Sequence, residues 1–154
     1  MEPGAAPLYY EDLTVGRVFR TPTIEVTESE IVTFASRYDP QPFHTDPAAG
    51  DASVFGGLAA SGWLTGALTM RLINLGEAKL AGGLIGLGVE AMNWPRPVHP
   101  GDVLTAVTTV MEMRPSASRP TYGVVKFTTT TTNQKGKTVM VMTAHQLVLR
   151  RSPA

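Results

Sequence analysis

An acidic and an imidazole side chain, Asp39 and His44, lie five residues apart in the segment DPQPFH. Two prolines stiffen this segment, so the two side chains can keep a fixed relative orientation at a small entropic cost. A carboxylate beside an imidazole can share proton transfer near neutral pH. The same residues also fit a structural role, with Asp39 at a helix end and His44 bonded to a tight turn. The segment alone leaves both interpretations open.

A second candidate feature is the segment AASGWL at residues 59–64, which directly precedes an apolar stretch. A helix that starts here would expose unpaired N–H groups and partial positive charge, which suit a developing oxyanion. Gly62 would let a carbonyl group approach the backbone closely. Alternatively, Ser61 is only a helix N-cap and Gly62 only a packing residue.

Composition narrows the class of protein. The 154 residues carry 13 basic and 13 acidic side chains with no clustered basic face, so we expect no binding to nucleic acid. The chain has no cysteine and three histidines, and no spacing typical of metal ligands, so we expect neither a metal nor another cofactor. The 43% share of hydrophobic residues is ordinary for a globular protein.

The chain reads as one domain over residues 9–150, preceded by a flexible tail over residues 1–8 that is rich in proline and alanine. The N-terminus lacks the basic and apolar regions of a secretory signal. No segment reaches the roughly 18 apolar residues that a membrane span needs. These features predict a cytoplasmic protein without a membrane association.

The elements before the second candidate feature can be predicted in order. Residues 17–26 favour a strand, with Pro22 indicating an edge position. Thr27 and Glu30 form a capping box that begins a helix, and Pro40 should end that helix at Asp39. The next segment, DPQPFHTDPAAG, holds three prolines, so no regular structure is expected in it.

Residues 63–75 predict a helix that is buried all round, because Arg71 is its one charged residue. Gly76 is well placed to end it. An apolar segment near residue 85 and three runs rich in valine, threonine and methionine follow, and NQKG predicts a hairpin turn between the last two runs. The last run is apolar on both faces, which is typical of a central strand covered twice. The three runs cover residues 103–113, 122–132 and 138–149.

This order of elements predicts an α+β fold in which a curved antiparallel sheet removes the apolar surface of one long helix from water. Taken together, YDPQPFHTDP, FGGLAASGW and RPVHPGD resemble the MaoC-like dehydratase family, which includes the R-specific enoyl-CoA hydratases. The resemblance extends from about residue 9 to residue 149 and implies the hot-dog fold. Asp39, Pro42 and His44 match the hydratase signature D-x-N-P-x-H.

The resemblance implies a hydratase or dehydratase that acts on an enoyl- or 3-hydroxyacyl-thioester, with a coenzyme A thioester as substrate. Asp39 and His44 would activate one water, Asp39 as the general base, and the Gly62 N–H would stabilise the thioester oxyanion. Ser61 and Gln41 join Gly62 as expected substrate-binding residues. The family pattern has asparagine at position 41 and often histidine at position 61. A homodimer is also implied, with the two sheets joined edge to edge.

Two other functions fit the same fold. A hot-dog thioesterase typically has an acidic residue on the central helix, and residues 63–75 contain none. The other alternative is a protein without enzymatic activity, either a module that binds acyl-CoA or an auxiliary subunit. The paired Asp39 and His44 argue against it, while the departures at Gln41 and Ser61 leave it open.

Overall fold

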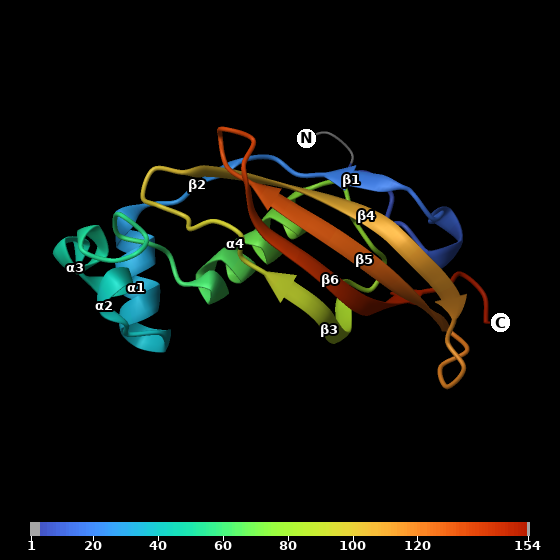
Figure 1. The fold of residues 1–154 in the computed structure, drawn as a ribbon. Coiled ribbons are helices and arrows are strands. Elements are labelled where there is room, and N and C mark those ends of the chain that lie inside the picture. The colour runs from blue at the N-terminus through green and yellow to red at the C-terminus, as the bar shows by residue number, and fades with distance from the viewer. Residues whose placement is uncertain (1–3, 154) are drawn as a thin grey trace.

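A curved antiparallel sheet covers one long helix, α4 (Gly62–Leu75), in the computed structural model, which describes residues 4–153 (Figure 1). The strand order is β1-β4-β5-β6-β3, and β2 also pairs with β4. All pairings among these strands are antiparallel. The strands are β1 (Val18–Arg20), β2 (Ile24–Glu25), β3 (Ile85–Asn93), β4 (Val103–Pro115), β5 (Tyr122–Thr132) and β6 (Thr138–Leu149). The predicted α+β architecture is confirmed.

The helix α1 (Glu28–Tyr38) begins and ends where the sequence predicts. The Thr27 hydroxyl accepts a hydrogen bond from the Glu30 N–H at 3.1 Å, and the Glu30 carboxylate accepts one from the Thr27 N–H at 3.3 Å. Asp39 is the C-cap, and its N–H donates to the Ala35 carbonyl at 2.9 Å. The capping box and Pro40 therefore fix the residue at which the chain leaves the helix.

The proline-rich segment after α1 contains regular structure, so the expectation of an irregular loop is wrong. It forms two short helices, α2 (Pro42–Thr45) and α3 (Pro47–Asp51), each with proline in its first turn. Proline is favoured there because its missing N–H would have no intrahelical partner. Together with α1 they gather at one end of the sheet, on the left in Figure 1.

The predicted strand over residues 17–26 is divided into β1 and β2. Pro22, which has no N–H to donate, lies between the two pieces, and both pair with β4. A smaller element, the 3₁₀ helix η1 (Tyr10–Asp12), precedes β1. The edge position inferred from Pro22 agrees with this pairing.

Helix α4 confirms the predicted helix but not its burial on all sides. Leu64, Leu68 and Leu72 are buried against the sheet, whereas Trp63 on the opposite stripe is 64% exposed. The core therefore lies between one face of α4 and the inner face of the sheet. The main cluster there contains Val26, Ile31, Leu58, Ala60, Leu64, Leu68, Leu72, Val98, Leu104, Ala106 and Val139.

The three predicted runs form β4, β5 and β6, and NQKG makes the turn between β5 and β6. The turn is closed by a hydrogen bond from the Asn133 N–H to the Lys137 carbonyl, with Gly136 at a φ of 70°. Strand β6 is central, between β5 and β3. The expectation that both its faces are covered is wrong, because the outward residues Val141 and Thr143 are only half-buried.

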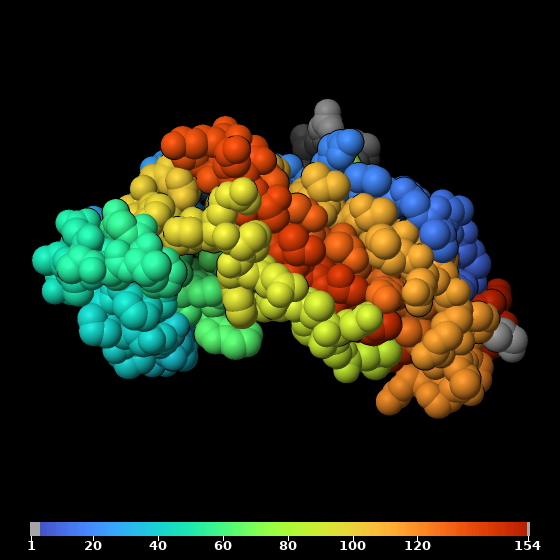
Figure 2. Space-filling model, in the orientation of Figure 1, coloured from blue at the N-terminus to red at the C-terminus, as the bar shows by residue number. Residues whose placement is uncertain are grey.

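Strand β3 forms one edge of the sheet and is almost entirely exposed. Its apolar side chains include Leu87 and Val89, which are 53% and 55% exposed. Figure 2 shows this yellow-green segment along the outside of the molecule, beside the strands drawn in orange and red. An apolar edge strand with unpaired backbone groups is suited to pairing with another strand.

The predicted flexible tail falls partly on residues 1–3, which lie outside the described residues. At its other end, the Leu8 N–H donates to the Lys79 carbonyl at 2.7 Å and the Leu8 carbonyl accepts from Ala81. Close to the C-terminus, the Arg151 guanidinium donates hydrogen bonds to both carboxylate oxygens of Asp12. Along residues 4–153, no helix combines the length and the apolar character that crossing a membrane requires.

Candidate active site

The His44 side chain is held in a fixed orientation on α2. It is buried, and its Nδ1 lies 2.5 Å from the Ala59 carbonyl oxygen. A carbonyl oxygen can only accept a hydrogen bond, so Nδ1 carries the proton. In the neutral imidazole the lone pair is therefore on Nε2. The backbone of Ala59 sets which nitrogen of His44 can take up a proton.

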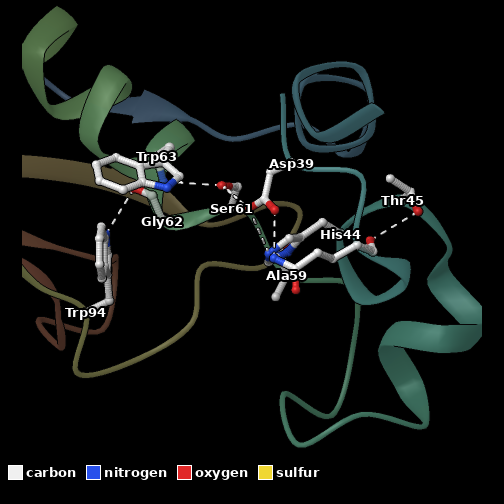
Figure 3. A network of polar contacts seen from close by, with 9 residues as sticks. Asp39, His44, Thr45, Ala59, Ser61, Gly62, Trp63 and Trp94 are labelled. Carbon is white, nitrogen blue, oxygen red and sulfur yellow. Dashed lines mark hydrogen bonds and ion pairs between the residues drawn. The ribbon is translucent and has the colours of Figure 1, made fainter. Parts of the chain in front are cut away.

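The Asp39 carboxylate faces that nitrogen from the end of α1. Its Oδ2 lies 3.5 Å from His44 Nε2, which is too long for a good direct hydrogen bond (Figure 3). The other oxygen, Oδ1, accepts from the Gln41 amide at 2.7 Å, and Oδ2 also accepts from the Ser61 hydroxyl at 2.7 Å. The predicted pair does come together, with Asp39 anchored by two neutral donors.

Electrostatics keep Asp39 ionised. The hydrogen bonds from Gln41 and Ser61, and to a lesser extent the charge of His44, hold the pKa of Asp39 below its ordinary value of 3.8, although burial opposes them. A carboxylate that accepts hydrogen bonds on both oxygens is stabilised in its charged form. Near neutral pH, Asp39 therefore presents a negative charge to the His44 ring.

The start of α4 meets this pair. Ser61 is the N-cap, and its Oγ accepts from the Trp63 N–H at 3.3 Å while it donates to Asp39. Gly62 is the first helical residue, and the N–H groups of a first turn have no acceptor within their own helix. The positive end of the α4 dipole and a backbone donor therefore lie next to the Asp39 and His44 pair.

The side chain of Trp94 packs against Gly62 and restrains its backbone. Its indole N–H donates to the Gly62 carbonyl at 3.0 Å, and its ring crosses the ring of Trp63 at an interplanar angle of 77°. A Cβ atom at position 62 would lie 2.6 Å from Trp94 Cε2, so only glycine fits against this ring without a shift. The sequence predicts that a carbonyl group approaches Gly62 closely, whereas in the structure the group that lies against Gly62 is the indole ring of Trp94.

These residues surround an open cleft of about 540 Å³. Its inner wall is made by buried residues, including Thr65 of α4 and Val98, and its mouth by exposed ones such as Val54 and Trp63. The lining residues are Asp39, Gln41, Phe43, His44, Val54, Phe55, Ala60, Gly62, Trp63, Thr65, Trp94, Pro95, Arg96, Pro97 and Val98. A cleft of this volume can hold most of a small-molecule ligand.

The five residues that the sequence predicts for the site lie close together in the structure, but two of them have a different role from the one expected. Gln41 and Ser61, expected to bind substrate, both donate to Asp39, and Ser61 does not line the cleft. Sequence reasoning missed Trp94, because one tryptophan in a proline-rich corner carries no signal of what it packs against. It missed Phe43 and Phe55 for the same reason.

Two further histidines lie outside the cleft. His99 Nδ1 lies 2.9 Å from the Leu58 carbonyl oxygen, which ties the ring to the local backbone. His145 Nε2 lies 3.0 Å from the Glu90 carboxylate on the neighbouring strand β3. Among residues 4–153, no group of three or more histidine and acidic side chains is arranged to hold a metal ion.

An antiparallel sheet curved around one helix, with an acid and a histidine at the start of that helix, defines a hot-dog protein of the dehydratase type. The MaoC-like domain family matches residues 12–133, and the chain belongs to this family. A MaoC-like dehydratase from Rhodospirillum rubrum has a crystal structure that superposes with a TM-score of 0.90 at 47% sequence identity. The match covers 94% of this chain and 99% of that one.

Two other relatives are similar to this chain over most of its length. The R-hydratase PhaJ1 from Pseudomonas aeruginosa, in its unliganded form, superposes with a TM-score of 0.75 at 29% identity, over 94% of this chain and 88% of that one. The uncharacterized protein YdeM of Bacillus subtilis is 31% identical over 126 residues, which is 81% of this chain and 87% of that protein. The predicted family and hot-dog fold are confirmed.

Proposed function

We propose that the protein is a hydro-lyase that adds water to a 2-enoyl thioester, or removes it from a 3-hydroxyacyl thioester, with coenzyme A as the carrier. The observation that carries the proposal is the 3.5 Å separation of Asp39 Oδ2 and His44 Nε2 beside the start of α4. A gap of 3.5 Å is too short to hold a water between the two atoms, but one water in the cleft beside them can hydrogen-bond to both. The R-hydratase among the relatives supports the same class of reaction.

His44 fits the role of general base better than Asp39, to which the resemblance assigns it. The lone pair of Nε2 faces the bridging water, whereas the lowered pKa of Asp39 makes its carboxylate a weak proton acceptor. Asp39 instead orients the water and stabilises the imidazolium that forms. Both residues are then needed for the reaction, His44 for proton transfer and Asp39 for orienting the water.

The reaction balances with this single base. The water oxygen bonds to Cβ, Nε2 of His44 takes one water proton, and the electron pair of the double bond moves toward the thioester oxygen. The imidazolium then returns its proton to Cα, which restores the neutral ring. The Gly62 N–H donates to the thioester oxygen while it carries negative charge, and the dipole of α4 adds to this stabilisation.

Loss of the enoyl-thioester absorbance, followed in the ultraviolet with crotonyl-CoA and the purified protein, tests the proposal. Saturable hydration is the expected result, with product identified as the 3-hydroxyacyl thioester. Binding of the thioester without turnover would instead indicate the non-catalytic module. Release of free thiol, measured with a thiol reagent, would indicate the thioesterase.

We further propose that the protein is a homodimer in which the β3 strands of two copies pair at their edges. The support for it is the exposed apolar strand, with Leu87 and Val89 each more than half exposed in the isolated chain. A partner strand would pair its free backbone groups and cover these side chains. A cytoplasmic location and the absence of a cofactor stay predictions from the sequence.

A further inference from the structure

The cleft has a direction, which follows from the burial of its walls. Val54 and Trp63 at the mouth are 94% and 64% exposed, whereas Thr65 and Val98 on the inner wall are each 2% exposed. A thioester whose carbonyl meets the Gly62 N–H would therefore leave its carrier at the mouth. Its acyl group would run inward along α4, past Thr65.

One turn beyond Thr65, the space between the helix and the sheet is closed. The hydroxyl groups of Thr69 on α4 and Thr131 on β5 form a 2.7 Å hydrogen bond, and both residues are fully buried. Neither residue lines the cleft. This bond joins the helix directly to the middle of the sheet, across the path that an acyl chain would take.

A second cavity lies on the far side of the pair. It has a volume of about 10 Å³, which is close to the room for one water and too small for a chain of methylene groups. Ile73 of α4 and the hydrogen-bonded pair Thr108 and Thr129 are part of its wall, and it shares no lining residue with the cleft. Along α4, Thr69 lies between Thr65 of the cleft and Ile73 of the second cavity, so the Thr69 and Thr131 pair lies between the two spaces without lining either.

We propose that the Thr69 and Thr131 pair forms the inner end of the acyl site and restricts the protein to short-chain acyl thioesters. Thr69 follows Gly62 by seven residues, which is about 10 Å along a helix axis. After van der Waals contact at both ends, a staggered chain of ~1.5 Å bonds fits about six carbons at most. The proposal rests on the function proposed above, because the Gly62 N–H sets where the carbonyl lies.

Binding of saturated acyl-CoA thioesters, which cannot react, measures the acyl site independently of turnover. We expect calorimetric affinity for butanoyl-CoA and hexanoyl-CoA to increase by up to roughly fourfold per methylene. Affinity for octanoyl-CoA and decanoyl-CoA should then stop rising or fall. A steady increase through decanoyl-CoA would overturn the proposal, because the chain would then lie elsewhere, such as along the exposed stripe of α4.

Variants of the Thr69 and Thr131 pair distinguish the effect of its side-chain volume from the effect of its hydrogen bond. The double variant Thr69→Ala/Thr131→Ala opens the partition, so we expect the affinity for octanoyl-CoA relative to hexanoyl-CoA to rise by about tenfold or more. Thr69→Val/Thr131→Val removes the hydrogen bond but keeps the volume, so the chain-length limit should stay that of the wild type. The matched control Thr108→Ala/Thr129→Ala deletes an equally short buried pair, 2.7 Å, outside the path, and should leave the limit unchanged.

The outcomes distinguish this proposal from the proposed reaction. A sharp length limit in binding without hydration of crotonyl-CoA would keep the partition and refute the hydro-lyase. Efficient hydration of decenoyl-CoA by the wild type would support the hydro-lyase and refute the chain-length limit. An unchanged limit in a folded Thr69→Ala/Thr131→Ala protein, with folding checked by circular dichroism, would show that the pair does not end the site. No binding of any member of the series would overturn both.

Discussion

The Ser61 hydroxyl donates a 2.7 Å hydrogen bond to the Asp39 oxygen that also faces His44. Ser61 is the N-cap of α4 and Asp39 is the C-cap of α1, so this contact joins the start of one helix to the end of another. The carboxylate cannot turn away from His44 without breaking it. The geometry of the site is therefore set by where two helices meet, and the following predictions examine the groups at that junction.

Asp39→Asn and His44→Ala should each lower kcat/KM for enoyl-CoA hydration by about 10²–10⁴-fold, because each removes one member of the acid–base pair. Circular dichroism should show an unchanged fold. Asp46→Asn is a suitable control, since Asp46 caps α3 in the same segment and asparagine caps helices equally well. Hydration by either site variant at the wild-type rate would refute the assignment of these residues.

The lowered pKa of Asp39 makes folding stability depend on pH. Because the pKa is lower in the folded than in the unfolded state, the ionised carboxylate stabilises the fold above the ordinary value of 3.8. This contribution should be lost as the pH falls from that value through the folded pKa. Ser61→Ala and Gln41→Leu should raise the folded pKa, which can be measured by NMR titration of the Asp39 carboxyl carbon.

A control for the serine variant is Ser53→Ala. The Ser53 hydroxyl donates to the Gly50 carbonyl at 2.6 Å and has no contact with Asp39. The Asp39 titration should be the same in this variant as in the wild type. An Asp39 titration unmoved by Ser61→Ala would mean that this hydroxyl does not stabilise the carboxylate in solution.

Gly62→Ala should lower the melting temperature and the hydration rate together. Its Cβ would lie 2.6 Å from Trp94 Cε2, so the indole ring would have to move away from the start of α4. Gly66→Ala on the same helix is the matched control, since its nearest contact is Met92 Cε at 3.9 Å. Replacing this helical glycine should instead stabilise the protein by about 0.5–1 kcal/mol. Equal thermal melts of the two variants would contradict this account.

Trp94→Phe removes the N–H that donates to the Gly62 carbonyl but retains an aromatic ring. We expect kcat to fall while KM changes little, because the first turn of α4 loses a restraint that matters most when the oxyanion forms. Trp63→Phe serves for comparison. It changes the other ring of the pair and leaves the hydrogen bond intact, so its kcat should stay near that of the wild type.

Val89→Lys should produce a monomer if β3 is the subunit interface. A charged side chain on an edge strand opposes edge-to-edge pairing. The molar mass can be measured by light scattering during size-exclusion chromatography. Lys135→Glu in the exposed β5–β6 turn is a control for a change of surface charge, and its mass should match the wild type. A Val89→Lys protein with dimer mass would place the interface elsewhere.

Local signals in the sequence predicted those elements whose boundaries are set by neighbouring residues. The capping box at Thr27 and Glu30 and the turn at Asn133 to Gly136 are examples, since their partners lie within four residues. Three prolines in one segment indicate an irregular loop, and this expectation misses the short helices α2 and α3. In fact, proline at the first position of a helix supports it.

Long-range packing could not be predicted from the sequence. The contact between Trp94 and Gly62 joins residues 32 positions apart, and Ser61 reaches Asp39 over 22 positions. The pattern of apolar residues indicates a buried helix, but it does not indicate which side the sheet covers, so it does not predict the exposure of Trp63. The site residues were found from their types and spacing, while the work of Gln41 and Ser61 depended on the folded geometry.

The spacing between Thr27 and Asp39 has a consequence for how such a protein can change over evolutionary time. Each residue added to or removed from α1 turns the end of the helix by about 100°. A single insertion there would swing the Asp39 carboxylate away from His44, even if the helix itself remained intact. The exposed connection at residues 117–121, between β4 and β5, carries no such constraint. Natural length variation should therefore accumulate in that connection and spare α1.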